Sequence, residues 1–291
     1  MSKIVLSHIS LFVANLIYAI NYIVAKDVMP EYISPKGFVL LRVLGASLLF
    51  FLIHKLFIKE RITKKDLRLL LVCSLFGVVI NMLCFFEGLS ITSPINASLI
   101  MIMTPLIVYI LSLVFLIERM SYGGFLGVFL GLSGAFILIT NGMSFQLNNR
   151  GDLLVLLNAL SYSFYLILIK SMMKKYHPIT VLKVIFLIGT IIITPIAWKD
   201  IVILNWPHLP LIIILKGVFV IVFTTCIAYF LNIFSLKHVP SSTVAFYIYL
   251  QPLLATLIAV VFGKDILTPL KILATVLIFC GVYFVLKRKT I

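Results

Sequence analysis

The chain is poor in charge, poorest in acids, and carries no catalytic signature. Charged residues make up 11% of its 291 residues and only nine are Asp or Glu, while 63% are hydrophobic and the mean hydropathy is +1.22. A soluble domain cannot bury that much apolar surface. The scarcity of charge therefore excludes an ordinary soluble protein and indicates a chain that crosses a membrane several times.

The four cysteines lie inside apolar runs without C-x-x-C spacing, so we expect small buried hydrophobic residues and no disulfide. H-E-x-x-H, G-x-S-x-G and Walker A patterns are absent, and no pair of intramembrane carboxylates or cluster of histidines is ready for hydrolysis. We therefore expect no catalytic residues, no metal, no cofactor, and a protein that is not an enzyme.

The chain contains instead many apolar runs of roughly 18 to 20 residues, the length that a helix needs to cross a bilayer. The alternating pattern of a lipid-facing barrel is absent, so these runs are predicted to be helices. We count ten, near Ile4–Ala25, Gly37–Ile53, Leu69–Phe86, Ile95–Ile117, Tyr122–Thr140, Leu153–Ile169, Val181–Trp198, Leu211–Leu236, Val244–Phe262 and Leu270–Leu286.

The net charge of +15 has a distribution that argues against nucleic acid as a partner. With ten spans, the N-terminus, the even-numbered loops and the C-terminus share one side of the membrane. That side carries sixteen Lys and Arg residues, and the opposite side carries six. Because Lys and Arg favour the cytoplasmic side, both termini are predicted to be cytoplasmic.

The two halves of the chain share landmarks in the same order. Sliding residues 93–121 onto 240–268, a shift of 147, pairs Pro105 with Pro252. Because the shift spans five helices, an odd number, the second half enters the membrane from the opposite side. The sequence thus predicts an all-α membrane protein with ten transmembrane helices as two inverted five-helix repeats, residues 1–140 and 153–291, joined by a loop at 141–152. Such proteins bind their substrate near the bilayer midplane.

Polar side chains recur on one face of the first and sixth spans. Asn15 and Tyr18 share a face in the first, Asn158 and Tyr162 share one in the sixth, and a shift of 144 aligns the two tyrosines. Lipid cannot satisfy hydrogen bonds, so these faces are predicted to point into the bundle. There they either line a cavity or simply hold helices together.

The charged residues inside the spans have two interpretations each, and two prolines have one. Arg42 and Lys216 either extend toward the interface or hold a substrate carboxylate. Glu87 is either hydrated at a helix end or a proton-coupling group. Pro105 and Pro252 are predicted to kink their helices and to act as paired hinges.

Three glycines four residues apart, Gly123, Gly127 and Gly131, form a ridge that lets another helix approach closely. This ridge packs either within the chain or between the protomers of a homodimer.

The arrangement resembles the EamA-type transporters of the drug/metabolite transporter superfamily. The resemblance rests on ten helices in two inverted halves, on Arg42 early in the second span, and on a central proline, a closing acid and a Ser or Thr in two matched spans: Pro105, Glu118 and Ser121; Pro252, Asp265 and Thr268.

The resemblance implies export of amino acids or related small metabolites across a bacterial inner membrane, with a small-molecule substrate and membrane lipid as the partners. It places the substrate in a central cavity formed largely by spans 1, 3, 4, 6, 8 and 9. The lining residues that it implies are Asn15, Tyr18, Asn81, Thr104, Asn158, Tyr162, Tyr229, Tyr247 and Gln251.

Other functions remain open. An intramembrane enzyme that modifies lipid would need acids, histidines or a metal converging near one membrane face. A non-transporting assembly protein would have a closed, dry interior lined by packed aliphatic side chains. Sugar-phosphate or nucleotide-sugar exchange is the weaker transport alternative, because a polyanion needs several inward cations and only Arg42 and Lys216 are available.

Overall fold

The computed structural model describes residues 2–92, 97, 100–115, 121–140, 149–261 and 268–287. All the elements in these ranges are helical. They are α1 (Lys3–Val28), α2 (Pro35–Phe57), α3 (Lys64–Ser74), η1 (Leu75–Val79), α4 (Ile80–Ile91), α6 (Thr104–Val114), α7 (Tyr122–Thr140), α8 (Asn149–Met173), α9 (Pro178–Val202), η2 (Trp206–His208), α10 (Leu211–Phe219), η3 (Val220–Ile227), α11 (Ala228–Leu236), α12 (Ser241–Phe246), η4 (Tyr247–Tyr249), α13 (Leu250–Val261) and α14 (Pro269–Lys287). The helix α8 begins inside the range predicted as the connecting loop.

Six helices in the described ranges are long and apolar enough to cross a membrane. They span Lys3–Val28, Pro35–Phe57, Lys64–Ile91, Arg150–Met173, Pro178–Val202 and Leu211–Leu236, and shorter apolar helices span Thr104–Val114, Tyr122–Ile137 and Ile272–Val285. Large apolar side chains such as Leu48 and Ile191 are exposed on the outer faces of α2 and α9. Lipid solvates such faces, and the chain is an all-helical integral membrane protein.

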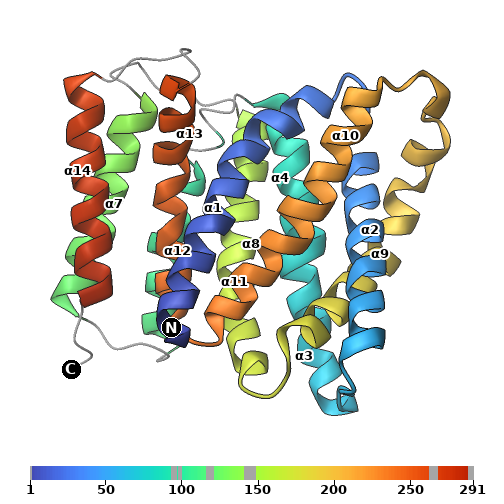
Figure 1. The fold of residues 1–291 in the computed structure, drawn as a ribbon, viewed down its shortest axis with the longest axis horizontal. Helices are drawn as coiled ribbons and strands as arrows, with labels where there is room; N and C mark the ends of the chain where they lie inside the picture. Colours follow the sequence, from blue (N-terminus) through green and yellow to red (C-terminus); the bar gives the residue numbers. More distant parts are fainter. Residues whose placement is uncertain are drawn as a thin grey trace.

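Helices of the first half of the chain pack against helices of the second half (Figure 1). α1 packs against α11 and α13, α8 packs against α4 and α6, and α2 packs against α9. α7 and α14 lie together at one edge of the molecule, on the left in Figure 1. The first turn of α1 and the last turn of α14 lie at the same end, the lower end in that view. The interior is therefore built by helices of both halves.

Two lysines make matched contacts in the two halves. Lys26 Nζ donates to the carbonyl of Leu89 at 2.9 Å, and Lys170 Nζ donates to the carbonyl of Leu236 at 3.2 Å. Each lysine also donates to the carbonyl three residues after the first one, which is that of Thr92 for Lys26 and that of Val239 for Lys170. Leu236 follows Leu89 by the predicted shift of 147. The last carbonyls of a helix have no partner within it, so each cation stabilises a helix end.

Two π-helical segments interrupt the helices at matched places. η1 separates α3 from α4, η3 separates α10 from α11, and the shift of 147 places η1 inside η3. A π-helical turn is rare and occurs mostly at functional sites. In η3, Thr225 Oγ1 donates to the carbonyl of Val220, five residues earlier, at 2.9 Å. The third and eighth predicted spans thus share an irregular turn.

Pro105 and Pro252 lie in the first turns of helices, which differs from the prediction of kinks within continuous spans. α6 begins at Thr104 after a turn at 102–103, and α13 begins at Leu250 after the short segment η4. A proline in the first turn costs no intrahelical hydrogen bond. The helix therefore ends and restarts at these places, and the hinge role stays a prediction.

Glycines bring α7 and α14 into backbone contact. A Cβ atom on Gly281 would lie 2.7 Å from the Gly127 carbonyl oxygen and 2.7 Å from the Gly131 nitrogen. Gly127 and Gly131 belong to the ridge predicted from the sequence. The ridge therefore packs a helix of the same chain, and a homodimer stays a prediction.

We expect Gly281→Ala to lower the free energy of unfolding by about 1–3 kcal/mol, because the added methyl group collides with the backbone of α7. The measurement is thermal unfolding of the purified protein in detergent. Gly217→Ala is the matched control, since nothing lies within 4 Å of the added Cβ and alanine favours the helix. Equal melting temperatures for the two variants would contradict the close α7–α14 contact.

Candidate functional site

A cavity of about 90 Å³ lies among helices of both halves, large enough for several water molecules, since one needs roughly 10–15 Å³. Ten of its lining residues come from the first half of the chain and eight from the second. They are Asn15, Tyr18, Asn21, Tyr22, Arg42, Asn81, Met82, Phe85, Phe86, Met101, Asn158, Tyr162, Thr224, Tyr229, Asn232, Val244, Ile248 and Gln251.

Eight of the eleven substrate-binding residues predicted from the sequence line this one cavity. They are Asn15, Tyr18, Arg42, Asn81, Asn158, Tyr162, Tyr229 and Gln251. These residues come from α1, α2, α4, α8, α11 and α13, which are far apart in the sequence. The fold thus brings them together, and their role in binding stays a prediction.

Thr104, Lys216 and Tyr247 lie outside the cavity lining. Thr104 is fully buried at the start of α6, and Lys216 Nζ lies 2.5 Å from Asp27 Oδ2 in an ion pair. The Tyr247 hydroxyl lies 3.0 Å from His8 Nδ1, and the two rings stack. Each of these three side chains therefore contacts the protein away from the cavity.

Glu87 lies at the rim of the bundle, where it forms an ion pair with Lys36 at 3.5 Å. Its side chain is 32% exposed, and it is not among the residues that line the cavity. A hydrated acid at a helix end fits this position, and the coupling role stays a prediction. Glu118 and Asp265, the closing acids of the resemblance, lie outside the described residues.

Side-chain hydrogen bonds connect α1 to the second half across the cavity. Gln251 Nε2 donates to Asn15 Oδ1 at 2.8 Å, and Asn15 Nδ2 donates to the carbonyl of Leu11 at 2.7 Å. Asn232 Nδ2 donates to the Tyr18 hydroxyl at 3.1 Å. Buried polar groups need such partners, so these bonds hold α1 against α11 and α13.

The carbonyls of η1 are bound by side chains of the second half. The Tyr229 hydroxyl lies 3.1 Å from the Gly77 carbonyl oxygen and 3.1 Å from Asn81 Oδ1, so it can donate to either. Ser161 Oγ donates to the carbonyl of Phe76 at 2.6 Å. The irregular turn of the third predicted span is therefore stabilised by α8 and α11.

Arg42 is the cation among the residues that line the cavity, and none of these residues is acidic. It is only 2% exposed. Its Nε donates to Thr225 Oγ1 at 2.9 Å, and its guanidinium carbon lies 4.3 Å from the centre of the Phe86 ring. The Arg42 guanidinium is thus contacted by Thr225 at one edge and by Phe86 on one face.

Ten lining residues were not among those predicted. They are Asn21, Tyr22, Met82, Phe85, Phe86, Met101, Thr224, Asn232, Val244 and Ile248. Helical spacing contained a signal for the amides, since Asn21 follows Tyr18 by three residues and Asn232 follows Tyr229 by three. The apolar residues carry no such signal, because the same side chains suit a face exposed to lipid.

The chemistry of the lining is compatible with a binding site for a small solute. Amides, phenols, aromatic rings and one guanidinium orient a small solute, and within the described ranges no group of three or more His, Cys, Asp or Glu could hold a metal ion. Polar groups gathered inside a bundle of membrane-crossing helices mark a path for solute. The fold and the site define a polytopic membrane protein with an internal polar cavity.

Comparison with protein families agrees with this class. The profile of the EamA-like transporter family matches residues 5–140 and again residues 149–287, which together cover most of the chain. The chain belongs to the EamA-like transporter family, and it is a membrane transporter.

Two known sequences and one solved structure that are similar to the chain are informative. An uncharacterized transporter of Archaeoglobus fulgidus is 26% identical over 259 residues, which cover 89% of this chain and 91% of that protein. The Bacillus subtilis uncharacterized transporter YyaM is 25% identical, with coverage of 86% and 84%. A protein of known crystal structure superposes with a TM-score of 0.79 at 17% identity, covering 97% of this chain and 98% of its own. This last likeness shows a common fold.

Tyr229→Phe should lower the free energy of unfolding by about 1–3 kcal/mol, because a buried carbonyl and a buried amide oxygen lose their shared donor while the ring is kept. Thermal unfolding in detergent measures the effect. The control is Tyr122→Phe, at a side chain that is 92% exposed, which should leave the melting temperature unchanged. An unchanged melting temperature for Tyr229→Phe would show that the bond to η1 contributes nothing.

Proposed function

We propose that the protein is a secondary transporter that exports amino acids or related small metabolites by alternating access. The observation that carries the proposal is the cavity, because both halves of the chain supply its polar and aromatic lining. A site shared by two halves becomes accessible from one side or the other when the halves move against each other. Export is the direction that the family resemblance implies.

We further propose that the chain forms ten transmembrane helices as two inverted five-helix repeats. The two matches of the family profile, the lysine contacts at Leu89 and Leu236, and the paired π-helical segments all support this architecture. In each pair, the two features are separated by 147 residues or by a number that differs from 147 by at most three. The division into residues 1–140 and 153–291 is part of this proposal, with α8 and the second profile match beginning a few residues earlier, at 149.

The proposed location is a bacterial inner membrane with both termini in the cytoplasm. The surplus of Lys and Arg on the side of the termini supports this orientation. The position of the first turn of α1 and the last turn of α14 at one end of the molecule agrees with it (Figure 1).

The other functions have less support. A non-transporting assembly protein would have a dry interior lined by aliphatic side chains, whereas this lining contains six amide side chains and four tyrosines, of which Asn15 and Tyr18 are examples. A lipid-modifying enzyme would need converging acids, and the lining has none. A sugar phosphate would need several cations, and Arg42 is the one that the lining provides.

Filling the cavity should stop transport. We expect Met101→Trp, which places an indole in the cavity, to abolish efflux of a transported solute, measured by its release from overexpressing cells across a panel of amino acids and dipeptides. Met103→Trp is the matched control, since Met103 lies two residues on and is 41% exposed. Equal efflux by both variants at equal expression would count against the cavity as the transport site.

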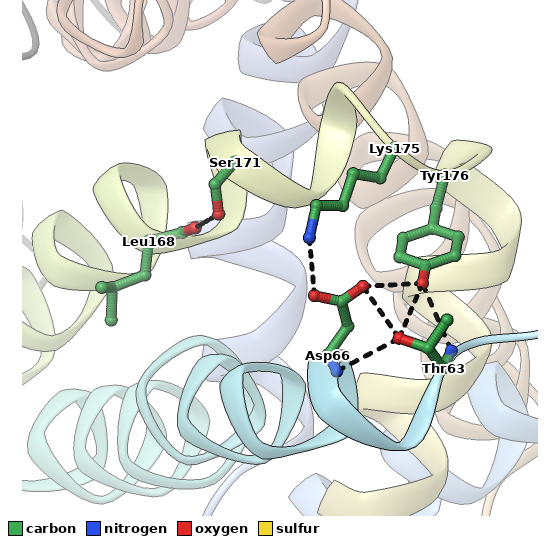
Figure 2. A network of polar contacts seen from close by, with 6 residues as sticks. All are labelled: Thr63, Asp66, Leu168, Ser171, Lys175 and Tyr176. Carbon is green, nitrogen blue, oxygen red and sulfur yellow. Dashed lines mark hydrogen bonds and ion pairs between the residues drawn. The ribbon is translucent and has the colours of Figure 1, made fainter.

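A polar network joins two helix connections at the end of the molecule where α1 begins (Figures 1 and 2). Figure 2 shows Thr63, Asp66, Lys175 and Tyr176 joined across the α2–α3 and α8–α9 connections. Lys175 Nζ lies 2.7 Å from Asp66 Oδ1, and the Tyr176 hydroxyl donates to Asp66 Oδ2 at 2.8 Å. The bond to Asp66 raises the pKa of Lys175, so the pair stays ionised at neutral pH. We propose that this network is the gate on the cytoplasmic side.

Asp66→Asn should weaken this gate, because the amide loses the ion pair with Lys175. We expect spin labels at Lys65 and Lys174 to show a distance distribution shifted toward longer values than in the protein with Asp66 intact. Lys64→Gln removes a neighbouring charge outside the network and should leave the distribution unchanged. Identical distributions for all three proteins would refute the gating role of the network.

A further inference from the structure

Arg42 is a buried cation that forms no ion pair with any acid of the described residues. It lies on α2, it is 2% exposed, and its Nη1 has no hydrogen-bond partner among the described residues. The ion pairs among the described residues do not include Arg42. They are Lys36–Glu87, Lys175–Asp66 and Lys216–Asp27. The titratable side chains that face Arg42 are tyrosines and a cysteine, which are neutral at pH 7: Tyr18, Tyr229 and Cys226.

A lone charge in the interior of a membrane protein is costly, and it is normally paired or turned toward a water-filled path. Arg42 lines the cavity, so a solute there can supply the missing charge. Lys216, the other cation that the sequence singled out, already has Asp27 as its partner. The structure therefore distinguishes the two cations that the sequence left as equals.

The guanidinium is held in a fixed position. Thr225 accepts from Nε, and Thr225 is itself held by its bond to the Val220 carbonyl within η3. The ring of Phe86 lies against the face of the guanidinium. Because Nη1 has no partner among the described residues, the planar guanidinium can still donate to a carboxylate. Thr225 and Phe86 act here as positioning residues.

We propose that Arg42 binds the carboxylate of a small organic monocarboxylate, and that recognition of this solute requires no ammonium group. The proposal rests on the proposed function, since the carboxylate belongs to the transported solute. One cation neutralises one anionic group, and the loaded cavity then carries no net charge through the membrane interior. An ammonium group is dispensable because no carboxylate of the lining faces it.

The remainder of the lining suits an uncharged body. Asn158 Oδ1 and Thr224 Oγ1 are buried and lack hydrogen-bond partners among the described residues, so they accept bonds from a hydroxyl or amino group of the solute. Aromatic rings such as that of Tyr22 supply apolar contact area. These groups add orientation, and the carboxylate supplies the charge.

The test uses the full chain, purified in detergent, and three compounds that differ only in their charged groups: L-leucine, 4-methylpentanoate and L-leucinamide. The alanine and phenylalanine series, with propanoate and 3-phenylpropanoate as the deaminated acids, vary the body of the solute. Melting temperature and calorimetric titration measure binding. We expect the acid and the amino acid of at least one series to bind, and its amide to bind at least tenfold more weakly.

Three variants locate the charge. Arg42→Gln should weaken carboxylate binding at least tenfold, while its melting temperature without solute is equal to or above that of the parent, because an unneutralised buried charge has been removed. Arg42→Lys should recover part of the binding. Lys216→Gln, which removes a cation outside the cavity, should bind as the parent does.

Several results would overturn the proposal. They are no binding by any carboxylate of the three series, equal binding of carboxylate and amide, loss of binding when only the ammonium group is removed, or full binding by Arg42→Gln. The parent protein alone tests the first three, whether or not the variants fold. Flux of the same compounds in proteoliposomes distinguishes a failure of the proposed export function from a failure of the proposed role of Arg42. Carboxylate binding without flux refutes the export function, and flux that is equal for amides and carboxylates refutes the role of Arg42.

Discussion

In lipid, every backbone carbonyl must find its partner within the protein, and this requirement connects the two halves of the chain. At several places where a helix ends or widens, a side chain from another element supplies a hydrogen bond to a backbone carbonyl. Lys26 and Lys170 do so at helix ends, and Tyr229 does so at η1. The donors that stabilise η1 belong to the second half of the chain, and Tyr229 also lines the cavity. The same side chain therefore stabilises a helix and lines the proposed solute site.

The cavity combines many neutral polar groups with one charge. Neutral amides and phenols can exchange partners between protein, water and solute at small cost, because each exchange replaces one hydrogen bond by another. A guanidinium cannot be satisfied in this way, since its charge remains when its hydrogen bonds are filled. In the proposed binding mode, Arg42 distinguishes between solutes by charge, and the neutral lining distinguishes weakly between their uncharged parts.

The sequence predicted the helices and the inward polar faces because both follow from local rules. Apolar length indicates a membrane-crossing helix, and lipid excludes groups such as Asn15 and Tyr18 from outer faces. The pairing of Lys216 with Asp27 could not be predicted from local patterns, because the two residues are 189 positions apart in the sequence. Met82 was missed for a different reason, since an apolar side chain fits a lipid-facing position equally well. Whether Pro105 bends a helix or begins one depends on neighbouring elements, and a single segment does not contain that information.

The π-helical segments also change how the faces of their helices are counted. An α-helix advances by about 100° per residue, so each additional residue in a turn offsets everything beyond it by that angle. A helical wheel drawn across residues 75–79 or 220–227 therefore assigns the inward and lipid-facing sides correctly on one side of the segment only. Thr224 and Thr225 illustrate the result, since the first lines the cavity and the second holds Arg42 from beside it. In each of these two helices, the face that points outward before the π-helical segment is therefore rotated about the helix axis relative to the face that points outward after it.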